Sequence, residues 1–169
     1  METLPKILQQ RKRIVIKIGS GLLVEQNRLQ SQWLDQFSAE LAALKRHNID
    51  VAVISSGAVA LGENQIARAR TDWRLEQKQA AAAIGQIALA HHWHLAFARH
   101  HLIPAQILLT LQDTEQRTRH LNARATIRAL FKEQAIPVIN ENDTVATTQI
   151  RYGDNDRLAA RLATMISAD

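Results

Sequence analysis

Short apolar runs alternate with longer amphipathic segments along the chain. Four of the runs are rich in β-branched or apolar residues and end in polar or glycine-containing turns, a pattern typical of strands. We expect strands at residues 14–18, 51–54, 105–109 and 136–139. Because the runs are apolar on both faces, the pattern predicts an α/β fold, a mostly parallel sheet with helices on both faces.

Helical periodicity fills the intervals between these runs. We expect helices at residues 31–47, 55–65, 78–99, 114–134 and 155–167. Ser31 is a candidate cap for the first of them, and Gly85 is a local weak point in the third. A polar loop is expected at residues 68–74 and a short hairpin within residues 144–153.

The composition is that of a globular domain. The 169 residues are 46% hydrophobic and 22% charged, and the chain has no cysteine, which excludes disulfides, thiolate zinc sites and a cysteine nucleophile. The net charge of +5 suits an anionic ligand such as a nucleotide, and would also suit nucleic acid. No apolar stretch is long enough to span a bilayer and the first residues do not form a signal peptide, so we expect a cytoplasmic protein without membrane contact.

Polar clusters follow the expected strands. Right-handed crossovers would bring the carboxyl ends of all strands to one edge, where α/β sheets bind ligands. The clusters are 17–21, 55–58, 140–143 and 152–156. Each of the first two alone fits a turn or a helix cap, and neither is a Walker A loop or a nucleophile elbow. The last two are dense in acids and amides, which could bind an ammonium group or orient a lysine.

Two other groups of residues suggest different chemistry. His91, His92 and His94 resemble a metal site, but no Asp, Glu or Cys accompanies them, so surface or interface histidines are favoured and no resident metal is expected. Several arginines within residues 117–128 leave open a basic RNA-binding module; a solvated helix face or a subunit contact is favoured because no nucleic-acid motif accompanies them.

Taken together, the clusters resemble the amino acid kinase family, and within it the glutamate kinase branch, over almost all of residues 12–169. The segments that carry the resemblance are Val15–Ser20, Val53–Ala60, Lys78–Gln86, Leu121–Arg124, Pro137–Asp143 and Gly153–Asp156. The resemblance implies a three-layer sandwich and an enzyme that uses ATP and Mg²⁺ to phosphorylate the side-chain carboxylate of L-glutamate. The product would be glutamyl 5-phosphate, in the first step of proline biosynthesis.

The resemblance also implies roles for individual residues. Lys17 would contact the phosphates of ATP as a catalytic residue, with Gly19 and Ser20 in the adjoining loop, and Asp156 would orient the transfer lysine. The residues implied for binding glutamate are Ser56, Gly57, Asn140, Asp143, Asp154 and Asn155. Among these, Asp143 would receive the substrate ammonium, helped by Asn155.

The family's sheet continues beyond the last residue of this chain. Residues 1–169 are therefore expected to be a truncated kinase domain, its N-terminal glutamate-binding portion, without the nucleotide-binding half or any PUA domain, and inactive alone. Leu162 and Ile166 should then be poorly covered. The resemblance implies L-proline as feedback inhibitor. We also expect a homo-oligomer and no nucleic-acid partner. A kinase portion of a fused pyrroline-5-carboxylate synthase and a catalytically dead protein that binds glutamate or proline remain alternatives.

Overall fold

A computed structural model describes residues 5–8, 10–25, 28–66, 73–145 and 154–169. Its centre is a four-stranded parallel sheet in the order β1-β4-β6-β5. The strands are β1 (Arg13–Ile18), β4 (Asp50–Ser55), β5 (Pro104–Leu109) and β6 (Ile136–Glu141). All four lie where the apolar runs predict them. A separate antiparallel pair, β2 (Val24–Glu25) and β3 (Arg28–Leu29), was not predicted.

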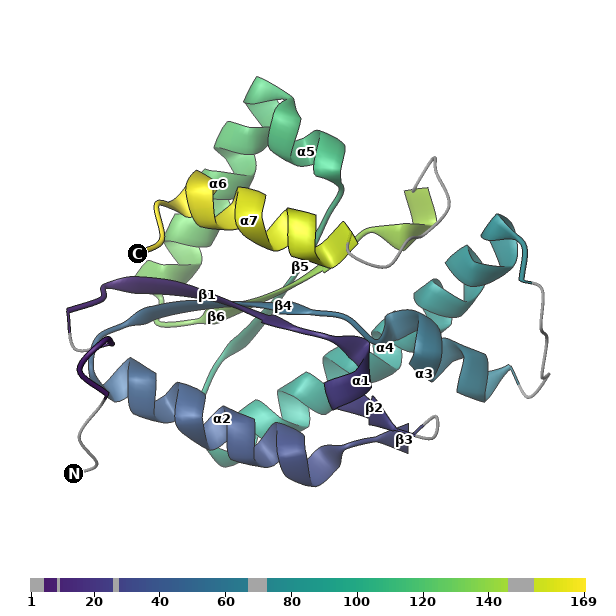
Figure 1. The fold of residues 1–169 in the computed structure, drawn as a ribbon, viewed down its shortest axis with the longest axis horizontal. Coiled ribbons are helices and arrows are strands. Elements are labelled where there is room, and N and C mark those ends of the chain that lie inside the picture. Colours follow the sequence, from purple (N-terminus) through teal and green to yellow (C-terminus); the bar gives the residue numbers. More distant parts are fainter. Residues whose placement is uncertain (1–4, 9, 26–27, 67–72, 146–153) are drawn as a thin grey trace.

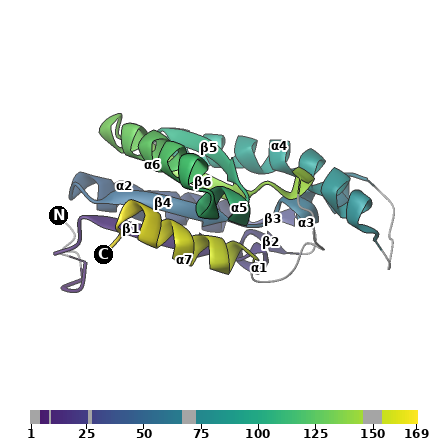
Figure 2. The same ribbon diagram turned by 90° about the horizontal axis from the view of Figure 1, so that it is seen from above.

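Helices cover both faces of the sheet, which confirms the α/β architecture with three layers (Figures 1 and 2). The helices are α1 (Ser20–Leu23), α2 (Ser31–Arg46), α3 (Ala58–Gln65), α4 (Leu75–Arg99), α5 (Leu111–Glu115), α6 (Arg117–Lys132), the 3₁₀ turn η1 (Asp143–Val145) and α7 (Asp154–Ile166). In Figure 1, α6 and α7 lie on one side of the sheet, and α2 and α4 lie on the other.

The alternation of side chains along β4 builds the two halves of the core. Val51 and Val53 pack into the cluster that contains buried residues of α2 and α4. Ala52 and Ile54 pack into the opposite cluster, with buried residues of α6 and α7. All four are fully buried, so the central strand contacts a helical layer on each face.

Three local expectations were wrong. The cap of α2 is Gln30 rather than Ser31, which is the first residue of the helix. The helix expected over residues 114–134 is divided at Gln116, whose extended backbone (φ −73°, ψ 116°) separates α5 from α6. Leu162 and Ile166 are fully buried rather than poorly covered, because α7 packs both of them against the sheet and α6.

Two glycines allow α3 and α4 to pack backbone against backbone. A Cβ atom on Gly62 would lie 1.8 Å from the Ala81 carbonyl oxygen, and one on Gly85 would lie 1.8 Å from the Ala58 carbonyl oxygen. Neither position has room for a side chain. Gly85, expected to be a weak point of its helix, is the residue at which α4 packs against the first residue of α3, Ala58.

Candidate functional site

Polar residues at the carboxyl ends of β1, β4 and β6 meet the first turn of α7 at one edge of the sheet. The strands are parallel, so their carboxyl ends lie on the same side. Hydrogen bonds and one ion pair join five of the predicted site residues: Lys17, Ser56, Asn140, Asn155 and Asp156. Tyr152 and Gly153, and all but the first two residues of the expected hairpin, lie outside the described residues.

The first part of the site is an exposed ion pair. Lys17 Nζ lies 2.8 Å from Asp156 Oδ1, and their side chains are 29% and 60% exposed. A Cβ atom on Gly19 would lie 3.7 Å from the same ammonium, and Ser20 begins α1. An ion pair this exposed adds little stability. It holds the ammonium at the end of β1, where an anionic ligand can approach it.

The turn after β4 contains two serines with different surroundings. The Oγ of Ser55 is buried and accepts a hydrogen bond of 3.0 Å from Trp93 Nε1. The Oγ of Ser56 instead accepts one of 2.9 Å from Asn155 Nδ2. Gly57 follows with φ +113°, a conformation that favours glycine, and α3 begins one residue later. Ser56 thus faces the predicted site, whereas Ser55 anchors the core.

Two asparagine side chains form the centre of the site. Asn140 is 4% exposed at the end of β6, and its Oδ1 accepts hydrogen bonds from Glu141 N at 2.9 Å and Asn155 Nδ2 at 3.0 Å. Asn155 Nδ2 donates to both Asn140 and Ser56, so both of its amide hydrogens are used. Asn155 Oδ1 is buried without a hydrogen-bond partner among the described residues. A bound donor would satisfy this oxygen.

Carboxyl groups gather beside these amides. Asp143 is 8% exposed; burial, reinforced by the nearby Asp154 charge, raises its pKa to about 6. Burial raises the pKa of Glu141 to about 7, with Asp154 and Asp143 adding to the shift and Arg157 opposing it. Both shifts show that negative charge at this end of β6 is poorly compensated. A cation bound there would favour the ionised carboxylates.

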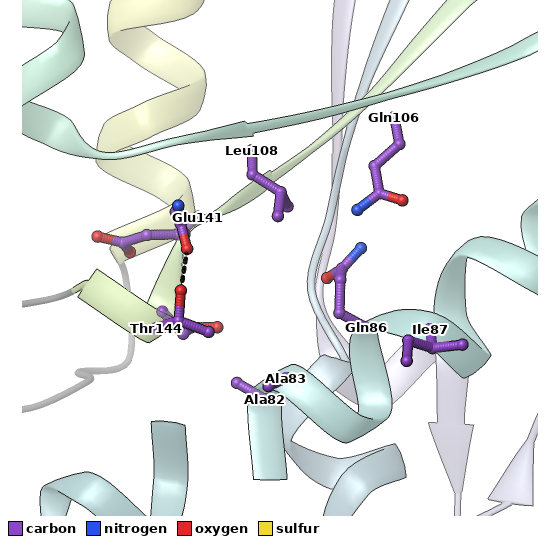
Figure 3. Close-up of a pocket in the computed structure, with 10 residues that line it drawn as sticks. Ala82, Ala83, Gln86, Ile87, Gln106, Leu108, Glu141 and Thr144 are labelled. Atoms are coloured by element: carbon purple, nitrogen blue, oxygen red, sulfur yellow. Dashed lines mark hydrogen bonds between the residues drawn. The ribbon is translucent and has the colours of Figure 1, made fainter. Parts of the chain in front are cut away.

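A cavity of about 250 Å³ opens between α4 and the end of β6 (Figure 3). Its apolar wall includes Ala82, Ile87 and Leu108. Its polar wall includes Gln86, Glu141 and Asp143. In Figure 3 the amide of Gln86 points across the cavity toward the amide of Gln106. The cavity combines an apolar floor with few polar groups, as small-molecule sites do.

Sequence reasoning missed two residues of this site. Glu141 stands inside the acid-amide cluster, but its half-burial and its neighbours became evident only in the fold. Gln86 accepts a hydrogen bond of 2.9 Å from Asn140 Nδ2 and lies 54 positions away in the sequence. The signal for Gln86 was its place in the segment Lys78–Gln86, which the family resemblance includes.

The alternative groups stand apart from this site. Trp93, between the histidines of α4, is 1% exposed, and no three His, Asp or Glu side chains in the described ranges lie close enough to hold a metal ion. Arg119 of α6 is paired with Asp113 at 2.9 Å. None of the helices in the described part of the chain is long and apolar enough to cross a membrane.

Comparison with known proteins confirms the family resemblance. Residues 12–169 match the amino acid kinase family. The chain is 59% identical over 165 residues to a glutamate 5-kinase of Agrobacterium fabrum, and 58% identical over 165 residues to a glutamate 5-kinase of Rhizobium etli. Each alignment covers 97% of this chain and 42% of the relative. The chain therefore spans about two fifths of the length of these curated relatives.

Proposed function

Because the chain belongs to the amino acid kinase family, we propose that it is the glutamate-binding part of a kinase domain. This kinase transfers the γ-phosphoryl group of ATP to the side-chain carboxylate of L-glutamate and makes glutamyl 5-phosphate for proline biosynthesis. One observation carries the proposal: the exposed Lys17 ammonium lies at the same sheet edge as the buried Asp143 carboxyl and Asn155 amide. The names of the similar proteins support the choice of substrate.

The reaction places few demands on acid-base chemistry. The attacking carboxylate is already an anion at neutral pH, so no general base is needed. The difficulty is to bring two anions together and to stabilise charge on the phosphoryl group in transfer. Lys17 supplies a positive charge for this, Asp156 orients its ammonium, and Gly19 and Ser20 form the adjoining loop.

We propose that Mg²⁺ enters with ATP. This ion is usually held by phosphate oxygens together with one or two carboxylates, and it neutralises their charge. Asp156 is the carboxylate beside Lys17, and its 60% exposure leaves it open to an incoming ion. The described residues offer no separate cluster of three or more metal-binding side chains.

The substrate ammonium fits the carboxyl groups at the end of β6. We place it against Asp143, with Asn155 Oδ1 as a second acceptor and with Asn140 and Asp154 nearby. Ser56 and Gly57 then hold the substrate near its carboxylate. The raised pKa of Asp143 and the unpartnered oxygen of Asn155 support this arrangement, since an ammonium group compensates both.

Formation of ADP from Mg–ATP by the full-length natural protein tests the proposal, with the acyl phosphate trapped by hydroxylamine. We expect ADP and a hydroxamate only when L-glutamate is present. Glutamate binding without ADP would favour a catalytically inactive binding protein. Absence of both binding and turnover would overturn the proposal.

L-Proline is proposed as a competing ligand at the same site. It shares the ammonium and α-carboxylate of glutamate, so Asp143, Asn155 and the turn at Ser56 could serve both. A titration in which proline and glutamate bind independently would exclude this shared site.

Homo-oligomerisation is a further proposal. Two side chains support it: Ile87 of α4 is 76% exposed, and Ile103 before β5 is 57% exposed. A cytoplasmic location and the absence of a nucleic-acid partner remain predictions.

A further inference from the structure

Gln86 of α4 lines the cavity and is hydrogen-bonded to Asn140 of the predicted substrate site. The preceding residue, Gly85, has no space for a Cβ atom because the Ala58 carbonyl oxygen lies against it. This close approach fixes α4 relative to the first residue of α3, which lies two positions after Ser56. Gln86 is therefore held by backbone packing, independently of its own side chain.

A directional series of hydrogen bonds begins at this glutamine. Gln86 Oε1 accepts from Asn140 Nδ2 at 2.9 Å. Asn140 Oδ1 accepts from Asn155 Nδ2 at 3.0 Å, and the second hydrogen of that amide goes to Ser56 Oγ at 2.9 Å. The Asn140 amide uses its nitrogen toward Gln86 and its oxygen toward Asn155, so these two contacts have opposite directions. We call these four residues the amide relay.

The direction of the hydrogen bonds in the relay determines which atom of Asn155 is left for a ligand. Asn140 Oδ1 also accepts from the Glu141 backbone N–H at 2.9 Å, so a reversed Asn140 would turn its NH₂ group toward two donors. With Asn140 held, both hydrogens of Asn155 point into the protein. Only the acceptor Oδ1 of Asn155, buried without a partner among the described residues, remains for a ligand.

We propose that Gln86 is a positioning residue that selects the ammonium group of the substrate through Asn140 and Asn155. By accepting from Asn140, it keeps Asn155 Oδ1 free to accept a hydrogen bond from a ligand. An ammonium group can donate that bond, whereas a ligand oxygen without a hydrogen cannot. This inference rests on the proposed function, because it assumes that glutamate binds at this edge. Gln86, on a helix outside the strand-end clusters, thus takes part in substrate selection.

Substitution of Gln86 by Met tests the relay, because methionine keeps the length and helix propensity and removes the acceptor. The binding of L-glutamate and of glutarate, which lacks the ammonium group, is measured by calorimetry on the full-length natural protein. We expect glutamate affinity to fall about tenfold, the usual cost of an unsatisfied buried polar group, and glutarate affinity to change less than about twofold. Gln36→Met, at an exposed position of α2, is the matched control and should change neither.

A double-mutant cycle with Asn155→Ala separates the relay from a direct contact. If Gln86 acts through Asn155, the Gln86→Met change has less than about a twofold effect in the Asn155→Ala background. Equal losses of glutamate and glutarate, or additive losses in the cycle, would overturn the relay while leaving the proposed function intact. Failure of the unmodified protein to bind glutamate would overturn the proposed function and the relay together. Gln86→Glu keeps an acceptor and should retain the preference for glutamate over glutarate, which guards against a folding defect in the Met variant.

Discussion

The two sides of the proposed site are built differently. Lys17 and Asp156 meet near solvent, with 29% and 60% of their side chains exposed, whereas Asn140 and Asp143 are 4% and 8% exposed. The exposed pair can exchange partners at little cost when a charged ligand arrives. The buried side has its amides fixed by hydrogen bonds before any ligand binds. Under the proposed function, the exposed side binds phosphate through charges that can exchange partners, and the buried side recognises the amino acid through side chains that are already oriented.

Loss of the exposed ammonium should produce the largest effect on turnover. We expect Lys17→Met to lower kcat about 10²- to 10³-fold, the typical loss when one group that stabilises the transition state is removed. Glutamate affinity should change less than about twofold, because the proposed partner of Lys17 is ATP and not glutamate. ADP formation and calorimetric titration measure the two quantities. A comparable loss of glutamate affinity would mean that the two sides have been exchanged.

Loss of the buried Asp143 carboxylate should weaken glutamate binding and leave the interaction with ATP almost unchanged. We expect Asp143→Asn to weaken glutamate binding about 100-fold, because the substrate ammonium loses a charge-assisted contact in a buried setting. The KM for ATP should be almost unchanged. The matched control is Asp156→Asn, an exposed carboxylate, for which glutamate affinity should stay within about threefold. Equal effects of the two substitutions on glutamate affinity would remove the distinction between the two sides.

The close contact between α3 and α4 supports the preorganised side. We expect Gly85→Ala to lower the free energy of unfolding by about 2–3 kcal/mol, since the new Cβ would lie 1.8 Å from the Ala58 carbonyl oxygen. Gly21→Ala is the control: a Cβ there meets nothing within 4 Å, and alanine favours a helix. Urea denaturation measures both. Unchanged stability of Gly85→Ala would show that α4 is not held by this contact.

The raised pKa of Asp143 predicts how stability depends on pH. The folded state keeps a proton on this carboxyl up to about pH 6, whereas the unfolded chain releases it near the ordinary pKa of 3.8. Between these values the folded state binds more protons, so the contribution of this carboxyl to stability without ligand falls as pH rises, by about 3 kcal/mol. Asp143→Asn should flatten this decline. A stability that rises through the same window in the unmodified protein, without ligand, would contradict the assignment.

The strands and the site edge could be predicted from sequence, because both depend on local patterns. Apolar runs located β1, β4, β5 and β6, and the polar residues directly after them were expected to meet at one edge. The break between α5 and α6 could not be predicted, since no Pro or Gly marks Gln116. The capping interaction between Thr110 and Asp113 explains only where the short helix α5 begins.

Long-range contacts explain the remaining differences. Leu162 and Ile166 were expected to be poorly covered, on the assumption that a missing strand was needed to bury them. The structure buries them against β4, β6 and α6 instead. Gln86 lies in the middle of a helix, and its contact with Asn140, 54 positions away, is evident only in the fold. Periodicity identifies which face of a helix is buried, but not which side chain it meets there.

The two neighbouring serines of the turn after β4 differ in the same way as the two sides of the site. The hydroxyl of Ser55 supports the core, and the hydroxyl of Ser56 supports the proposed site. We expect Ser55→Ala to lower stability by about 1 kcal/mol, because Trp93 Nε1 loses its buried acceptor, and to leave glutamate affinity unchanged. Ser56→Ala should leave stability nearly unchanged and weaken glutamate binding about fivefold, because Asn155 loses one of its two acceptors beside the proposed substrate position. Urea denaturation and calorimetric titration of both variants provide the four values. If Ser55→Ala were the variant with weaker glutamate binding, the hydroxyl that supports the core would also be the one that supports the site, and the division between the two serines would fail.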